Sequence, residues 1–253
     1  MSSPLPPNSL SGKSALVTGS SRGIGADTVK YLASAGAEVV INYRSKAPRA
    51  EKLATEINES GGKAITVGAD LTDADSLSAL REAIDSAYGK LDILVLNASG
   101  GMERDMGEDY ALKLNRDAQM NTIDALLPLM PAGSRIVFVT SHQAHFIREV
   151  ETMPEYVPVA LSKRAGEDAL LARIPELKEK GIDVVVVSGD MIEGTITATL
   201  LERANPGAIE SRRVDAGKLY NVAEFAAEVA KAVVEEAPAD NVRLIGDVSS
   251  FLK

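Results

Sequence analysis

The sequence predicts an α/β fold of the doubly wound Rossmann type, in which a parallel sheet is covered by helices on both faces. Short runs rich in β-branched residues alternate with segments of helical periodicity along the chain. Residues 184–187 are continuously apolar, as a strand buried on both faces requires. A glycine-rich turn follows the first expected strand and leads directly into a helical pattern. Together these three observations define the fold class.

The order of elements follows from the same patterns. We expect seven parallel strands, at residues 14–18, 38–42, 64–67, 93–96, 135–140, 182–187 and 242–245. Helices are expected at residues 25–34, 47–59, 76–88, 109–130, 159–179 and 222–235. Residues 189–221 contain no obvious buried strand and are expected to fold over the site as a lid. The composition shows no break, so we expect one catalytic domain at 13–253 after a flexible, proline-containing tail at 1–12.

Charge and composition exclude several classes of function. The formal net charge is -9 and no basic block exceeds the Arg212–Arg213 pair, which argues against binding to nucleic acid or acidic membranes. The absence of Cys excludes disulfides and thiolate chemistry. His142 and His145 lack an accompanying carboxylate motif, so we interpret them as loop histidines that line a pocket and expect no metal. No signal peptide or membrane span is recognisable, which favours a cytoplasmic protein with a small-molecule substrate.

The turn after the first strand has the composition of a phosphate-binding turn. Glycines allow the backbone to approach a pyrophosphate closely, and the N-terminus of the next helix offers N–H groups to it. The residues expected to contact the cofactor here are Gly19, Ser21, Arg22, Gly23, Ile24 and Gly25.

The end of the second strand predicts which dinucleotide is bound. An acidic residue at this place holds the 2′-hydroxyl of NAD. This chain has Tyr43, Arg44 and Ser45 instead, and Arg22 lies in the preceding turn. Guanidinium and hydroxyl groups suit a 2′-phosphate, so we expect NADP(H) as the cofactor.

Residues 18–25, 70–71, 97–100, Asn115 and Ser141 together resemble the short-chain dehydrogenase/reductase superfamily, and the resemblance extends from residue 12 to about 247. It implies further cofactor contacts along the chain, from Asp70, Leu71, Asn97, Ala98, Ser99, Gly100, Lys163, Ile192 and Thr195. It also implies that Asn115, Ser141 and Lys163 are catalytic. Ser141 would supply a hydroxyl to the reduced oxygen, and Lys163 would hold the nicotinamide ribose.

The sequence departs from this superfamily at the proton donor. The usual Tyr four residues before Lys163 is replaced by Val159, and the nearest phenol is Tyr156, seven residues before the lysine. We expect the helix to start near Pro158, which leaves Tyr156 just outside it on less rigid backbone. Tyr156 is therefore a candidate general acid or a residue that only lines the pocket, and its place outside the helix slightly favours the second role.

Three functions remain open. Residues 141–146 and 153–167 are similar to actinobacterial reductases that tailor aromatic polyketides in antibiotic biosynthesis, which makes an NADPH-dependent ketoreductase of a bulky polyketide the leading hypothesis. The spacing of Tyr156 and Lys163 resembles enoyl-thioester reductases, the alternative. A non-catalytic NADP sensor is the third. The expected helices at 109–130 and 159–179 carry surplus apolar surface and pair across a twofold axis in the resembling family, so we expect a homodimer or homotetramer.

Overall fold

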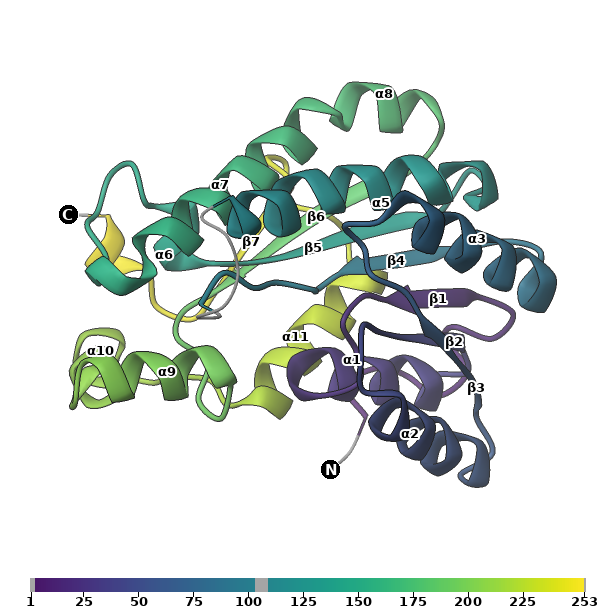
Figure 1. Cartoon of the computed structure of the whole chain (residues 1–253), viewed down its shortest axis with the longest axis horizontal. Coiled ribbons are helices and arrows are strands. Elements are labelled where there is room, and N and C mark those ends of the chain that lie inside the picture. The colour runs from purple at the N-terminus through teal and green to yellow at the C-terminus, as the bar shows by residue number, and fades with distance from the viewer. Residues whose placement is uncertain (1–2, 103–108, 253) are drawn as a thin grey trace.

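The computed structural model describes residues 3–102 and 109–252, so residues 1, 2 and 253 of the expected tail and domain lie outside it (Figure 1). Within the described residues, seven parallel strands form one sheet in the order β3-β2-β1-β4-β5-β6-β7. The strands are β1 (Ser14–Val17), β2 (Glu38–Tyr43), β3 (Lys63–Gly68), β4 (Ile93–Leu96), β5 (Arg135–Ser141), β6 (Asp183–Gly189) and β7 (Val242–Ile245). The predicted fold class and the seven predicted strands are confirmed.

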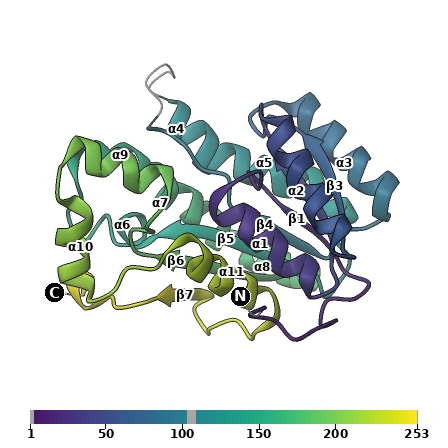
Figure 2. The same cartoon turned by 90° about the horizontal axis from the view of Figure 1, so that it is seen from below.

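Helices cover both faces of the sheet (Figures 1 and 2). One core lies beneath α1 (Gly23–Ser34), α2 (Ala47–Glu59) and α11 (Val222–Val234). The other lies beneath α3 (Ala74–Tyr88), α5 (Ala118–Leu126), α7 (Val157–Ala172) and α8 (Ile174–Glu179). Strand positions alternate between these two cores, as in β1, where Ala15 and Val17 join the first and Leu16 the second.

The order of the sheet reverses between β1 and β4, which are direct neighbours. In open parallel sheets ligands bind beyond the carboxyl ends of the strands at such a reversal. The segments that follow β1, β4 and β5 therefore meet at the edge where a cofactor and its substrate are expected.

Two expected helices are interrupted. The helix expected at 109–130 consists of α4 (Tyr110–Leu112), the π-helical turn η1 (Lys113–Asp117), α5 and the short 3-10 turn η2 (Leu127–Leu129). The helix expected at 159–179 divides at Arg173, because Pro175 lies in the first turn of α8 and cannot donate a backbone N–H to α7. Helix α7 begins at Val157, with Pro158 in its first turn, as the proline predicts.

The segment expected to form a lid contains α9 (Ile196–Ala204) and α10 (Ala208–Ala216). Ala198 and Leu201 of α9 and Ala216 of α10 join a third apolar cluster, separate from the two sheet cores. Three short turns complete the chain: α6 (His142–His145), η3 (Pro154–Tyr156) and η4 (Ser249–Phe251).

The described part of the N-terminal tail differs from the flexible segment that the sequence predicts. Leu5 and Leu10 are buried in the core beneath α1 and α2. The Leu10 N–H also donates to the carbonyl of Ala35, at the end of α1. These two leucines give the segment enough apolar contact to pack despite its prolines. In the described residues, none of the helices has both the length and the apolar character needed to cross a membrane.

Candidate active site

The turn between β1 and α1 fits a pyrophosphate. A Cβ on Gly25 would lie 2.6 Å from Asn97 Nδ2 and 2.8 Å from Ser20 Cα, so only glycine permits this packing. Helix α1 starts at Gly23, and its N-cap residue, Arg22, contributes no side-chain cap. The N–H groups of the first turn therefore face the site without a capping oxygen, which is the arrangement that binds phosphate groups.

Hydrogen bonds fix the carboxyl ends of three strands around this turn. Thr18 Oγ1 accepts from the backbone N–H groups of Asn97 (2.9 Å) and Ala98 (3.0 Å), and Asn97 Nδ2 donates to the Thr18 carbonyl at 3.0 Å. Asn42, at the end of β2, accepts from the Gly19 N–H at 3.0 Å. Asn97 and Ala98 thus join the carboxyl ends of β1 and β4. The sequence does not reveal that the side chains of Thr18 and Asn42 hold this turn in place, because their hydrogen-bond partners lie far away in the chain.

The far end of the cofactor groove is positively charged. Arg22, Arg44 and Ser45 are exposed at the ends of the first two βα turns, and Tyr43 is half-buried above Gly68. The Arg44 guanidinium lies 5.9 Å from the centre of the Tyr110 ring and donates to its hydroxyl. Tyr110 was not predicted, because it comes from α4, distant from Arg44 in the sequence.

Asp70 and Leu71, two of the expected cofactor contacts, follow β3, where the family resemblance implies the adenine. Leu71 is buried. Asp70 Oδ1 accepts from the backbone N–H and the hydroxyl of Thr72, at 2.9 and 2.8 Å. The Asp70 carboxylate therefore fixes the turn between β3 and α3, which places the edge of the expected adenine pocket.

Asn115 lies at the centre of the π-helical turn η1. Its side-chain amide donates to the Gly100 carbonyl and to Ser162 Oγ, both at 2.8 Å, and its Oδ1 accepts from the Gly100 N–H at 3.2 Å. Turns of this kind recur at functional sites. The side chain of Asn115 therefore joins the segment after β4 to helix α7.

Gly166 brings α7 against this turn. A Cβ on Gly166 would lie 2.0 Å from the Asn115 carbonyl oxygen, so the close approach requires glycine. One turn earlier on α7, Lys163 lines a narrow cavity together with Ala98, Ser99 and Asn115. In the part of the chain that the structure describes, the Lys163 ammonium has no protein partner, so it is available to a ligand.

Ser141 and Tyr156 contact each other through their hydroxyl groups. Their hydroxyl oxygens lie 3.2 Å apart and both side chains are buried. Ser141 ends β5 and caps α6, accepting from the Ala144 N–H at 3.3 Å. Tyr156 ends η3 and precedes α7, as Pro158 predicts.

The backbone of Tyr156 is better held than its place outside the helix suggests. Its N–H donates to the Met153 carbonyl at 2.8 Å. Its ring belongs to the third apolar cluster, where Ala144, Ala160 and Leu201 are also buried. Neighbouring Val159 is buried in the same cluster and has no group that donates a proton. The structure brings Tyr156 into contact with Ser141, and its role as general acid or as pocket lining stays a prediction.

The third apolar cluster forms the wall around Tyr156. Its buried members are Ala144, Tyr156, Val159, Ala160, Met191, Ala198, Leu201, Ala216 and Leu219. Half-buried Met102, Ile147, Met153 and Ile209 pack against it. Methionine side chains adapt their shape and make favourable contacts with aromatic rings. The Tyr156 ring is therefore enclosed by apolar side chains.

Ile192 and Thr195, which the family resemblance implies as contacts of the nicotinamide, follow β6. Ile192 is buried in the first core, and Thr195 caps α9, where its Oγ1 accepts from the Ala198 N–H at 3.2 Å and donates to the Ile192 carbonyl at 2.8 Å. Thr195 thus fixes the turn that carries both residues.

The two histidines lie in the short helix α6, where they support the structure, and not in a pocket-lining loop. His142 is fully buried, with Nε2 donating to the Ile245 carbonyl at 3.2 Å and Nδ1 accepting from Ser188 Oγ at 2.8 Å. Burial lowers the pKa of His142 to about 4, so its ring is neutral near pH 7. His145 Nδ1 lies 2.5 Å from the buried carboxylate of Glu167 on α7. Both rings find partners that the sequence pattern does not show.

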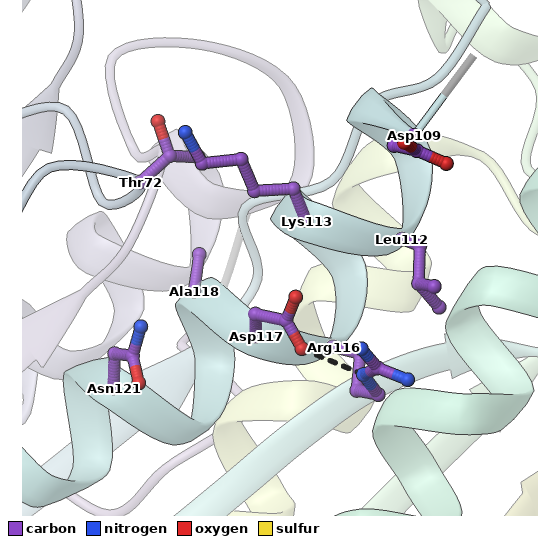
Figure 3. Close-up of a pocket in the computed structure, with 8 residues that line it drawn as sticks. All are labelled: Thr72, Asp109, Leu112, Lys113, Arg116, Asp117, Ala118 and Asn121. Carbon is purple, nitrogen blue, oxygen red and sulfur yellow. Dashed lines mark hydrogen bonds and ion pairs between the residues drawn. The ribbon is translucent and has the colours of Figure 1, made fainter.

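A separate cavity is lined by residues that flank Asn115 in the sequence (Figure 3). It has a volume of about 460 Å³ and none of Asn115, Ser141, Tyr156 and Lys163 lines it. Its lining residues are Thr72, Asp109, Leu112, Lys113, Arg116, Asp117, Ala118 and Asn121. Arg116 and Asp117 form an ion pair at 2.6 Å there. This cavity is therefore distinct from the Ser141–Tyr156 contact.

Comparison with known proteins identifies the family. A family model described as short chain dehydrogenase matches residues 13–205. The chain therefore belongs to the short-chain dehydrogenase family, whose members are NAD(P)-dependent oxidoreductases. The expected family is thus confirmed.

Among curated relatives, 1-cyclohexenylcarbonyl-CoA reductase of Streptomyces collinus is 32% identical over 70% of this chain and 64% of its own length. The hydroxynaphthalene reductase-like protein Arp2 of Metarhizium majus is 36% identical over 64% of this chain and 61% of its own length. The match thus spans less than two thirds of either relative.

Solved structures match over more of the chain. A short chain dehydrogenase from Burkholderia cenocepacia J2315, in complex with NADP, has a TM-score of 0.78 and 29% identity, covering 94% of this chain and 97% of that one. The angucycline C-6 ketoreductase LanV with bound NADP has a TM-score of 0.76 and 30% identity, covering 93% and 94%. Both neighbours contain the dinucleotide that the sequence of this chain predicts.

Proposed function

We propose that this protein is an NADPH-dependent ketoreductase that reduces a carbonyl of a bulky, apolar substrate of the polyketide type. The observation that carries the proposal is the buried contact between Ser141 and Tyr156, 3.2 Å apart beside an apolar wall. Two hydroxyls that converge in this way can bind one carbonyl oxygen. The names of LanV and the Arp2 reductase-like protein support a polycyclic aromatic ketone as the substrate class.

NADP(H) is the cofactor we assign to the glycine-rich turn. The close packing of Gly25 and the uncapped start of α1 fit a pyrophosphate, and Arg22, Arg44 and Ser45 fit a 2′-phosphate. Asp70, Leu71, Ile192 and Thr195 would hold the adenine and nicotinamide ends. When bound, NADPH supplies the hydride.

The chain's own residues then have three tasks. Ser141 donates a hydrogen bond to the substrate oxygen and stabilises the negative charge that develops there. Tyr156 transfers its phenolic proton to that oxygen. Lys163, which lacks a protein partner in the described chain, binds the nicotinamide ribose and places its positive charge near Tyr156. The Asn115 side chain, bonded to Ser162 one residue before Lys163, holds this part of α7 in place.

A second candidate function is reduction of an enoyl thioester. The offset of Tyr156 from Lys163 and the similarity to the Streptomyces collinus acyl-CoA reductase favour it. A non-catalytic NADP sensor has less support, because Asn115, Ser141, Tyr156 and Lys163 all lie around one region.

The test is NADPH oxidation by the purified protein with matched substrates. We expect turnover with polycyclic aromatic ketones and little with enoyl thioesters of similar size. Turnover with the thioesters alone would establish the second candidate. NADPH binding without turnover of either class would contradict both.

We further propose a homodimer or homotetramer in the cytoplasm, acting in antibiotic biosynthesis. Leu161 on α7 leaves 52% of its surface exposed, which a second copy of the chain would cover. Light scattering at micromolar concentration measures the assembly, and a monomer would contradict it.

A further inference from the structure

A buried ion pair connects the lid to the rest of the site. Asp190 follows β6, and its side chain is only 8% exposed. Arg212 on α10 donates through Nε to both carboxylate oxygens of Asp190 at 2.8 Å, and its Nη2 lies 2.7 Å from Oδ2. This is the bidentate geometry in which Arg binds carboxylates most strongly.

Two further groups donate hydrogen bonds to the Asp190 carboxylate. Gln143 of α6 donates to Oδ1 at 2.7 Å, and so does the backbone N–H of Met191, also at 2.7 Å. Asp190 thereby joins α6, two residues after Ser141, to the start of the segment that carries Ile192 and Thr195.

Arg212 also binds the C-terminal turn η4. Its Nη2 donates to Ser250 Oγ at 2.7 Å, and its guanidinium lies 4.3 Å from the centre of the Phe251 ring. Phe251 in turn stacks on Phe146 with ring centres 5.3 Å apart. Figure 2 shows α10 beside the C-terminal end of the chain, far from it in sequence. One guanidinium thus connects the lid, the C-terminus and the segment after β6.

We propose that Asp190 and Arg212 are positioning residues that hold α10 and the C-terminal turn closed beside the Ser141–Tyr156 pair, and that this clamp determines the KM for the ketone. Ala216 and Leu219, at and just beyond the end of α10, belong to the wall around Tyr156. Release of Arg212 would let this part of the wall move away. Removing Arg212 leaves the buried Asp190 carboxylate without its cationic partner, and removing Asp190 leaves Arg212 only the more exposed carboxylate of Asp215, 3.5 Å from its Nη1. Either single substitution therefore opens the clamp.

The kinetic test compares three single variants and one double variant with a matched control, and it rests on the proposed ketoreductase function. Asp190→Asn, Arg212→Gln and Arg212→Lys each should raise the ketone KM about tenfold or more, while the Kd for NADPH changes less than about twofold. Lys should not restore the native KM, because its ammonium group lacks the planar guanidinium geometry that contacts both carboxylate oxygens of Asp190. The double variant Asp190→Asn/Arg212→Gln should resemble the single ones, because both open the same clamp. The control, Arg213→Gln, removes the neighbouring ion pairs with Glu193 and Glu210, which are more exposed, and should leave KM nearly unchanged.

Hydrogen exchange tests the clamp without any substrate. In Arg212→Lys we expect faster exchange in α10, in residues 191–195 and in η4, with the sheet unchanged. Unchanged exchange in those three segments, or a fall in kcat and Tm at constant KM, would overturn the proposal. If the native protein reduces no ketone, the proposed function fails, while hydrogen exchange still decides whether the clamp exists.

Discussion

The hydroxyl oxygens of Ser141 and Tyr156 lie 3.2 Å apart, although one residue ends a strand and the other precedes a helix. Either group can donate in this contact. A carbonyl oxygen that enters between them would accept from both, since a phenol and a serine hydroxyl each carry one donor. In the proposed mechanism this pair would take the place of the phenol that is missing at position 159.

Ser141→Ala should reduce kcat/KM for the ketone by about 100-fold, because one donor to the reacting oxygen is lost. The same change removes the α6 cap and should lower the free energy of unfolding by about 1 kcal/mol. Steady-state kinetics and denaturant unfolding separate the two effects. Ser211→Ala, at an exposed serine of α10, is the control. A kinetic loss below about tenfold would remove Ser141 from the proposed chemistry.

Arg44→Asp should weaken NADPH binding by about 1 to 3 kcal/mol, because a charged donor to the 2′-phosphate is replaced by a repelling carboxylate. NADH binding should weaken less. Arg49→Asp, at an exposed position on α2, makes the same charge change outside the turn. Titration of both coenzymes measures the four affinities. Equal affinity of the native protein for NADH and NADPH would refute this assignment.

Gly166→Ala should disrupt the contact between α7 and η1, because the added Cβ would lie 2.0 Å from the Asn115 carbonyl oxygen. We expect a loss of about 1 to 3 kcal/mol in unfolding free energy and weaker NADPH binding, since Lys163 moves with α7. Ala165→Ser, the preceding and half-buried position, is the control for added volume. If Gly166→Ala leaves the free energy of unfolding unchanged, α7 and η1 do not approach each other closely at this position.

The buried ring of His142 should make the free energy of unfolding depend on pH. Its folded pKa of about 4 lies below the ordinary histidine pKa of 6.5, so the unfolded chain binds more protons between these values. Stability is therefore full above about pH 6.5 and falls as the pH decreases toward 4. Between pH 7 and pH 5 the loss should be about 2 kcal/mol.

Denaturant unfolding at both pH values, with His142→Gln for comparison, isolates this contribution. The Gln variant is less stable at pH 7 but should lose less on acidification, because it has no ring to titrate. Parallel losses in the two proteins would show that His142 is not the group responsible.

The sequence predicts those features that local patterns determine. The alternation of β-branched and helical segments places β4 and β7 at their observed bounds, and Pro158 predicts the start of α7. The π-helical turn at Asn115 depends instead on the distant Gly166, and the split at Arg173 on Pro175. Helices α9 and α10 escaped prediction because their stability comes from packing around Tyr156 and from the Asp190–Arg212 pair.

Local patterns likewise predict some residues of the candidate site and not others. Glycines 19, 23 and 25 and the basic end of β2 reveal the cofactor groove by composition alone. The role of Tyr156 could not be settled by spacing, because its reach toward Ser141 depends on where η3 and α6 lie. Tyr110, Thr18 and Asn42 act through contacts with residues far away in the chain, which no local motif records.

The most direct test of the account is the turnover of Tyr156→Phe with a ketone that carries no phenol of its own. Phenylalanine keeps the ring packed in the apolar wall and removes only the hydroxyl. We predict that kcat falls by about 100-fold or more, with the NADPH Kd nearly unchanged. A loss of less than about tenfold, expressed mainly in KM, would contradict the account and reduce Tyr156 to a pocket-lining residue.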